Sequence, residues 1–115
     1  MKEVKAPPAK TKEVFDYVKA CAKDMRTVTY KEVANAVGLA PTGMAFPLGY
    51  IRDHICIERG LPWLNVIVVS SESHRPGDKF LPTSVDFGAD DELLWRGMVL
   101  QVFSYPWDTV SFDQT

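Results

Sequence analysis

Hydrophobic residues recur at helical spacing near the start of the chain. From about Lys12 to Met25 the apolar positions lie four, three and four residues apart, as on one face of an α-helix; they are Val14, Val18, Cys21 and Met25. This spacing predicts a first helix over residues 12–25. We expect about residues 1–11, which include Pro7-Pro8, to form a flexible arm.

A second, shorter helix is predicted from its start and stop signals. Thr29-Tyr-Lys-Glu32 has the pattern of a capping box, in which the threonine hydroxyl and the glutamate carboxylate each accept a hydrogen bond from the other residue's amide. Gly38 fits the left-handed conformation that often ends a helix. The residues expected on the inner face are Val33, Ala36 and Val37.

The next apolar pattern predicts a third helix from about Met44 to Arg59, ended by Gly60. Its inward positions are Leu48, Ile51 and Ile55. Proline is well tolerated only in the first turn of a helix. Pro47 therefore indicates either that the helix begins near Phe46 or that a separate short turn precedes it.

The second half of the chain predicts a strand, a hairpin and a last helix. Residues Leu64–Val69 are dense in β-branched side chains, which favours a strand. Residues 70–78 are polar and typical of a turn, and residues 79–81 would form the return strand. A last helix is predicted from about Asp91 to Phe103, with acidic residues in its first turn, where the helix dipole favours them.

Two helices joined by a short glycine-containing turn and followed by a hairpin are typical of winged helix-turn-helix domains. We therefore expect residues 1–115 to form a single α+β domain of this type, with a three-helix core, a small β-hairpin wing and a C-terminal helix. A length of 115 residues suits one modest hydrophobic core.

The charge is unevenly divided along the chain. The net charge is −2, but residues 1–83 carry 12 Lys/Arg against 9 Asp/Glu, and residues 84–115 carry one Arg against 6 acids. The first part is thus mildly basic, which is compatible with a nucleic-acid-binding face. No apolar run approaches the roughly 20 residues that span a bilayer, and the N-terminus has no signal-peptide pattern. We expect a cytoplasmic protein that does not enter a membrane.

Several motifs resemble one protein family. Thr29-Tyr-Lys-Glu-Val-Ala34 resembles the Thr-Tyr-Gly-Glu-Ile-Ala segment of the alkylguanine-DNA alkyltransferases and their non-enzymatic alkyltransferase-like relatives. Val37-Gly38, Pro41 and Leu48-Gly49 are similar to the connector and recognition helix of that family. Leu61-Pro62-Trp63 with Val66-Ile67 is similar to the Pro-Trp-His-Arg-Val segment by which the alkyltransferase-like proteins replace the Pro-Cys-His-Arg active site. The resemblance covers about residues 12–103.

This resemblance implies a DNA-binding domain without catalysis. Dealkylation needs a cysteine thiolate, and Trp63 stands in its place. The histidine and arginine that follow in the family fall on Leu64 and Asn65. The family's arginine finger, which takes the place of an extruded base, falls near Phe46, an apolar side chain of the kind that can wedge between bases. We expect no enzyme activity, no catalytic residue and no cofactor.

The predicted partner is DNA, with RNA as the alternative, held by the third helix and the wing. Arg52 and His54 would face the bases, and the cationic wing residues would hold phosphates. The candidate nucleic-acid-binding residues are Phe46, Tyr50, Arg52, His54, Trp63, Asn65, His74, Arg75 and Lys79. Each has a plainer interpretation: Trp63 and Phe46 as core aromatics, the helix charges as a solvated face, and the wing as an ordinary polar loop.

Two other functions stay open. The acidic C-terminal part is rich in aromatic residues and could make the chain a protein-interaction module, or an inhibitor or regulator of a nucleic-acid enzyme; the aromatics are Trp95, Phe103, Tyr105, Trp107 and Phe112. An enzyme with a pocket around Trp63 and Tyr50 is the third, although the sequence offers no nucleophile–base pair. A metal site is not expected, because the two cysteines and two histidines lack zinc-binding spacing.

Overall fold

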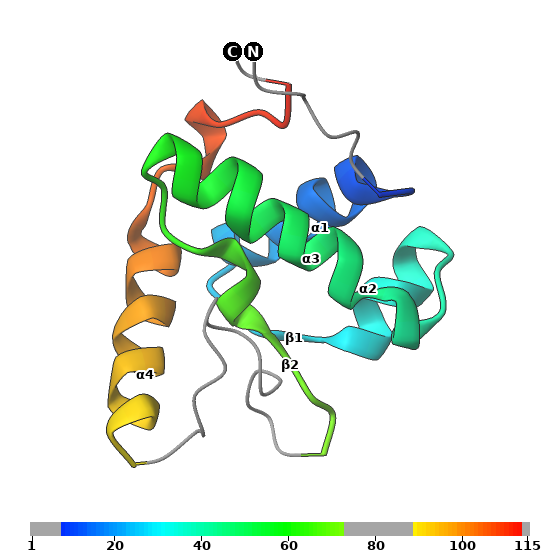
Figure 1. Ribbon diagram of the computed structural model, residues 1–115. Helices are drawn as coiled ribbons and strands as arrows, with labels where there is room; N and C mark the ends of the chain where they lie inside the picture. The colour runs from blue at the N-terminus through cyan, green and yellow to red at the C-terminus, as the bar shows by residue number, and fades with distance from the viewer. Residues whose placement is uncertain (1–7, 73–88, 114–115) are drawn as a thin grey trace.

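The computed structural model describes residues 8–72 and 89–113 (Figure 1). In chain order the elements are α1 (Thr11–Lys23), β1 (Val28–Thr29), α2 (Tyr30–Val37), the 3-10 turn η1 (Pro41–Gly43), α3 (Ala45–Tyr50), the π-helical η2 (Ile51–Ile57), the 3-10 turn η3 (Leu64–Ile67), β2 (Val68–Val69), α4 (Ala89–Ser104) and the 3-10 turn η4 (Trp107–Thr109). The described residues form a mostly helical α+β fold with one small parallel sheet. None of their helices is long and apolar enough to cross a bilayer.

Helix α1 packs against α2, α3 and η3. Val14, Val18 and Cys21 are buried, as the spacing predicts. The predicted C-terminal end was wrong: the helix ends at Lys23, and Met25 is exposed with a left-handed φ of 54°. The amide of Met25 donates to Ala22 O and closes the last turn.

The N-terminal boundary of α1 also differs from the expectation. The flexible arm was predicted to extend to residue 11, but Thr11 begins the helix and is buried. Its hydroxyl donates a hydrogen bond to Pro8 O at 2.6 Å, which holds the preceding turn against the helix. Residues 1–7 lie outside the described part of the chain.

Helix α2 begins and ends where the local signals predict. The Glu32 amide donates to Thr29 Oγ1 and the Thr29 amide donates to Glu32 Oε1, both at 3.0 Å. The hydrogen bond from the Thr29 amide lowers the pKa of the Glu32 carboxyl. Gly38 ends the helix with φ 79°. The predicted inner face needs one correction: Ala34 is buried beside Val33 and Val37, whereas Ala36 is exposed, because the contact face is centred on Val33 and Ala34.

Removal of the capping box is expected to destabilise the protein measurably. Thr29→Ala removes the acceptor for the Glu32 amide, so we expect the free energy of unfolding to fall by about 1 kcal/mol. Urea denaturation at neutral pH measures this change. Thr27→Ala, at an exposed threonine between α1 and β1, is a control expected to change stability by less than about 0.5 kcal/mol. Equal effects of the two substitutions would contradict the assigned cap.

The third helical segment is continuous from Ala45 to Arg59 and comprises α3, η2 and a last helical turn. Both expectations for Pro47 are met, since η1 forms a separate turn and α3 then begins next to Phe46 with the proline in its first turn. Leu48, Ile51 and Ile55 face inward, as predicted. The π-helical hydrogen bonding of η2 was not predicted. Gly60, with φ 67°, ends the segment.

The strand predicted over Leu64–Val69 was wrong for its first four residues. Leu64–Ile67 form the 3-10 turn η3, and only Val68–Val69 are strand. Tertiary contacts override the β-propensity here, because the Leu64 amide donates to the sulfur of Cys56 at 3.5 Å and Val66 O accepts the indole N–H of Trp95 at 2.8 Å. β2 pairs in parallel with β1, Val28 opposite Val68. The predicted return strand at residues 79–81 lies outside the described residues.

Helix α4 spans Ala89–Ser104, slightly longer than predicted. The chain after it, residues 105–113, lies against α1 and the C-terminal end of the third helical segment, and we call it the C-terminal strap (Figure 1). Lys19 Nζ donates to Val110 O at 2.9 Å, and Arg59 donates to the carbonyls of Ser111 and Phe112, each at 2.8 Å. Cationic side chains from two helices therefore hold the strap.

Candidate nucleic-acid interface

The segment α2–η1–α3 brings Phe46 to the surface. In η1 the amides of Gly43 and Met44 donate to the carbonyls of Ala40 and Pro41. Met44, Pro47 and Leu48 are then buried, which anchors the turn and the first residues of α3. The remaining side of this helical turn carries Phe46, whose surface is 72% exposed. The open question about Phe46 is thus decided: it is not a core aromatic.

A row of rings follows Phe46 along the helix. Tyr50 and His54 are placed at intervals of four residues, so they lie on nearly the same face. The rings of Tyr50 and His54 have centroids 4.8 Å apart. His54 Nδ1 lies 3.6 Å from the Glu58 carboxylate. We call Phe46, Tyr50 and His54 the aromatic row; its side chains suit stacking or wedging better than phosphate binding.

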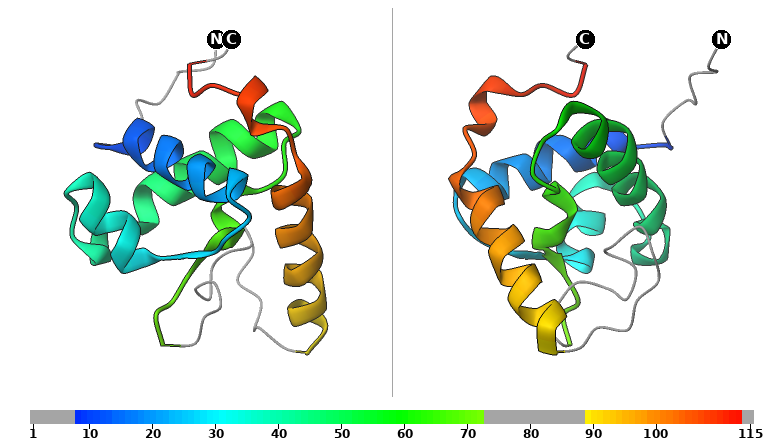
Figure 2. Two further views of the ribbon diagram at one scale, coloured as in Figure 1. Left: turned by 180° about the vertical axis from the view of Figure 1, so that it is seen from behind. Right: turned by 60° about the vertical axis from the view of Figure 1, so that its left-hand side comes forward.

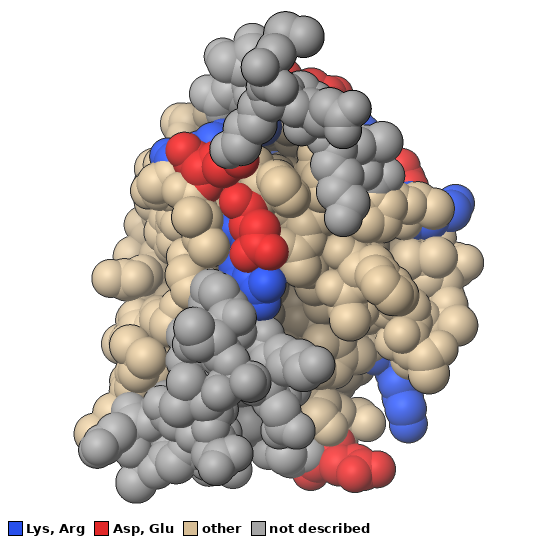
Figure 3. All heavy atoms as spheres, viewed as in Figure 1, with Lys and Arg blue, Asp and Glu red and all other residues tan. Residues whose placement is uncertain are grey.

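Arg52 of this helix is held in an ion pair with the neighbouring Asp53. Its Nε donates to Asp53 Oδ1 at 2.7 Å and its Nη2 to Asp53 Oδ2 at 3.0 Å. The bond from Arg52 lowers the pKa of Asp53, and only 16% of the arginine side chain is exposed. On the face shown in Figure 3, basic and acidic side chains lie side by side, without an extended basic patch among the described residues.

Trp63 and Asn65 are placed by the turn η3. Trp63 is half-buried and packs against the hydrophobic core, so the structure supports a mainly architectural role with part of the ring accessible. Leu64 and Asn65, where the resembled family has its histidine and arginine, are both buried. Asn65 is therefore a poor candidate for a nucleic-acid contact, because a 3-10 turn replaces the expected strand and directs it inward.

The predicted wing residues His74, Arg75 and Lys79 lie outside the described residues. Arg59, which the sequence places on a polar side of the third helix, is instead half-buried and donates to the C-terminal strap. Its role was missed because no local pattern reveals a contact with residues more than fifty positions away.

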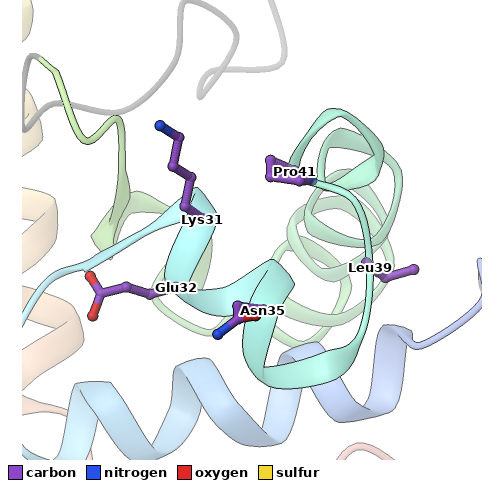
Figure 4. Close-up of a pocket in the computed structure, with 5 residues that line it drawn as sticks. All are labelled: Lys31, Glu32, Asn35, Leu39 and Pro41. Carbon is purple, nitrogen blue, oxygen red and sulfur yellow. The ribbon is translucent and has the colours of Figure 1, made fainter.

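A shallow groove next to α2 was also missed. It lies between α2 and η1 and is lined by Lys31, Glu32, Asn35, Leu39 and Pro41 (Figure 4). Lys31 rises from the first turn of α2 on the side of the groove that faces Pro41, whereas Glu32 and Leu39 point away from each other. The exposed ammonium group of Lys31 is suited to a phosphate contact. The sequence signal was the lysine at the position where the resembled motif has glycine.

Neither cysteine is placed as a nucleophile. Cys21 and Cys56 are buried, and burial raises the pKa of both thiols, to about 11 for Cys56. Such a thiol is almost entirely protonated at neutral pH and does not react as a nucleophile. Among the described residues, no group of three His, Cys, Asp or Glu side chains is placed to hold a metal ion.

The buried thiols lead to a prediction about pH. With a thiol-specific disulfide reagent at pH 8, we expect neither cysteine to react in the folded protein and both to react in urea, since the thiolate is the reactive form. The free energy of unfolding should also fall as the pH rises above about 8.5, where the unfolded thiols ionise. Urea denaturation between pH 7 and 10 tests this. Rapid labelling of one thiol in the folded protein would contradict the assigned burial.

Comparisons with models of protein families, with curated proteins and with solved structures find no match to this chain.

Proposed function

We propose that this protein is a non-enzymatic DNA-binding protein of alkyltransferase-like, winged-helix type. In this proposal α2, η1 and α3 form the helix-turn-helix, and the aromatic row faces the DNA. The observation that carries the proposal is the exposure of Phe46 at the beginning of α3. The resemblance places the side chain that takes the place of an extruded base near this position.

Phe46 is one of several exposed apolar side chains, and its place at the start of α3 is what distinguishes it. Burial of such a side chain stabilises a protein by about 1.5–3 kcal/mol, and Phe46 forgoes most of that gain. Phenylalanine at this position can enter a base step and partly unstack it, as apolar wedges of minor-groove-binding proteins do. Tyr50 lies on the same face four residues later, where its ring and hydroxyl would contact the adjacent sugar or base.

The charges suggest weak binding to regular duplex DNA. Sequence-independent affinity comes from neutralised phosphates, whereas Arg52 is engaged by Asp53 and the net charge is −2. Lys31 of α2 is an exposed cation among the described residues, and we propose that His74, Arg75 and Lys79 add phosphate contacts. A wedge should favour a duplex with a mismatched base pair, because unstacking then costs less.

Titration of labelled duplexes, one fully paired and one with a central mismatch, tests this function. We expect micromolar binding in low salt, weakened by added salt and tighter for the mismatched duplex. Phe46→Ala should raise Kd by roughly 5- to 150-fold, which corresponds to about 1–3 kcal/mol for one stacked base. Met25→Ala is the matched control, since Met25 is also an exposed apolar residue but lies in the turn after α1.

Two outcomes would oppose the proposal. The first is no binding of either duplex by micromolar protein in low salt. The second is equal binding by the wild-type protein and Phe46→Ala, which would leave the exposed ring without a role in the complex. If binding persists, Arg75→Ala is expected to reduce the slope of log Kd against log salt by about one.

The alternative function, a protein-interaction module in the C-terminal part, is favoured by a different observation. The aromatic residues there are mostly internal, since Trp95 and Trp107 are buried and Phe103, Tyr105 and Phe112 pack against the core. The exposed apolar side chains are instead leucines of α4. A cytoplasmic location stays a prediction for either function.

A further inference from the structure

Helix α4 is apolar on two opposite sides. Its inner side carries Trp95 and Val102, which are buried in the core. Its outer side carries Leu93, Gly97 and Leu100, at the spacing of four and three residues that defines one face of a helix. We call these three residues the outer stripe. A helix of an isolated globular protein normally has a polar outer side, and one that is apolar all round is normally covered on all sides.

No described element covers the outer stripe. Leu93 is 72% exposed and Leu100 is 65% exposed. Figure 2 shows α4 along one edge of the molecule, with the rest of the described fold on its inner side in both views. A shallow apolar depression lined by Trp95, Arg96, Val99 and Leu100 adjoins the stripe.

We propose that a second copy of this chain covers the outer stripe, with the two α4 helices antiparallel about a two-fold axis at Gly97. The stripe is self-complementary under this symmetry, as an isologous interface requires. At a rise of about 1.5 Å per residue, Leu93 lies about 6 Å before Gly97 along the axis and Leu100 about 4.5 Å after it. The two-fold axis therefore sets Leu93 against the partner's Leu100.

Gly97 fits the centre of such a contact. Glycine is unfavourable in the middle of a helix, and nothing in the described structure requires it there. A Cβ atom at position 97 would meet no heavy atom within 4 Å, and its φ is not left-handed. A missing side chain does, however, let a second backbone approach closely.

The charges on α4 permit the antiparallel arrangement. The acidic residues are in the first turn of the helix, and Gln101–Ser104 at the other end are uncharged. The acids of one helix therefore lie beside the uncharged end of the other. Arg96, near the two-fold axis, is paired with its own Glu92 at 3.3 Å. The small net charge of −2 also limits repulsion between two copies.

The size of the contact predicts a weak dimer. A helix of 16 residues is about 24 Å long and, with side chains, about 10 Å wide. One pair of helices then buries less than the roughly 800 Å² per partner of a standard stable interface. Association should therefore appear only at high micromolar concentrations.

Sedimentation equilibrium over about 10 µM to 1 mM protein, without DNA, tests the proposal. We expect the mass to rise from 12.9 kDa toward twice that value. Leu93→Glu and Leu100→Glu should each keep the protein monomeric. Leu94→Glu adds the same charge to an exposed leucine on the same helix, about 100° away from Leu93, and should leave the dimer intact. Far-UV circular dichroism checks that each variant stays folded.

Three results would overturn the proposal. One is a wild-type protein that stays monomeric at the highest concentration, which would leave the stripe to a different protein. Another is a dimer that persists in Leu93→Glu and Leu100→Glu. The last is an equal loss of association in Leu94→Glu, which would indicate a general effect of charge. None of these outcomes bears on DNA binding.

Discussion

Trp107→Ala is expected to lower the free energy of unfolding by about 3–5 kcal/mol, the range for removal of a large buried aromatic side chain. Only 1% of Trp107 is exposed, and its ring lies 5.1 Å from that of Tyr105. The indole N–H donates to Val102 O at 2.7 Å, which satisfies a carbonyl near the end of α4. The substitution therefore leaves a cavity and removes one of the two hydrogen bonds that Val102 O accepts, the other coming from the Tyr105 amide at 3.3 Å.

Urea denaturation of Trp107→Ala and Trp107→Phe separates these two contributions. Trp107→Phe keeps a ring but removes the donor, so we expect a smaller loss, of about 0.5–1.5 kcal/mol for the hydrogen bond. The anchors of the C-terminal strap from Lys19 and Arg59 are unchanged in both variants. A loss below about 1 kcal/mol for Trp107→Ala would show that the strap is not part of the folding unit.

Trp95→Ala is expected to destabilise the protein by a similar amount, about 3–5 kcal/mol. Trp95 is nearly buried on the inner side of α4, and its indole N–H donates to Val66 O at 2.8 Å. This bond attaches α4 to the turn η3. Loss of the side chain removes both core packing and the link between two elements that are distant in sequence.

A neighbouring leucine gives the matched control for Trp95. Leu93→Ala removes an exposed side chain from the same helix, and its effect in dilute protein should stay within about 0.5 kcal/mol. Urea denaturation, followed by far-UV circular dichroism to avoid dependence on tryptophan fluorescence, measures both variants. Comparable losses for Trp95→Ala and Leu93→Ala would contradict the assignment of the inner and outer sides of α4.

Local signals in the sequence predicted the helical part of the fold. The box between Thr29 and Glu32 and the glycines at positions 38 and 60 specify backbone conformations through contacts within a few residues. Helical spacing identified the buried positions of α1 and of the third helical segment. These predictions succeeded because the physical cause and its effect lie within one or two turns of chain.

The candidate interface was predicted less well from the sequence than the helices were. Phe46 is exposed because the neighbouring side chains of Met44, Pro47 and Leu48 occupy the side of the helix that faces the core. Arg52 is paired with Asp53 because of the direction of the Asp53 side chain in a π-helical turn. No sequence pattern predicted this turn. The identity of these residues was known in advance, but their accessibility was set by packing.

By itself the sequence determined the helices of a mostly helical fold, the capping box of α2, and the glycines that end α2 and the third helical segment. Only the tertiary structure decided that Leu64–Ile67 turn instead of extending, that Arg59 binds the C-terminal strap, and that α4 presents leucines on its outer side. The physical reason is range: caps and helical faces depend on neighbours a few residues away, whereas hydrogen bonds such as that from Trp95 to Val66 join residues 29 positions apart.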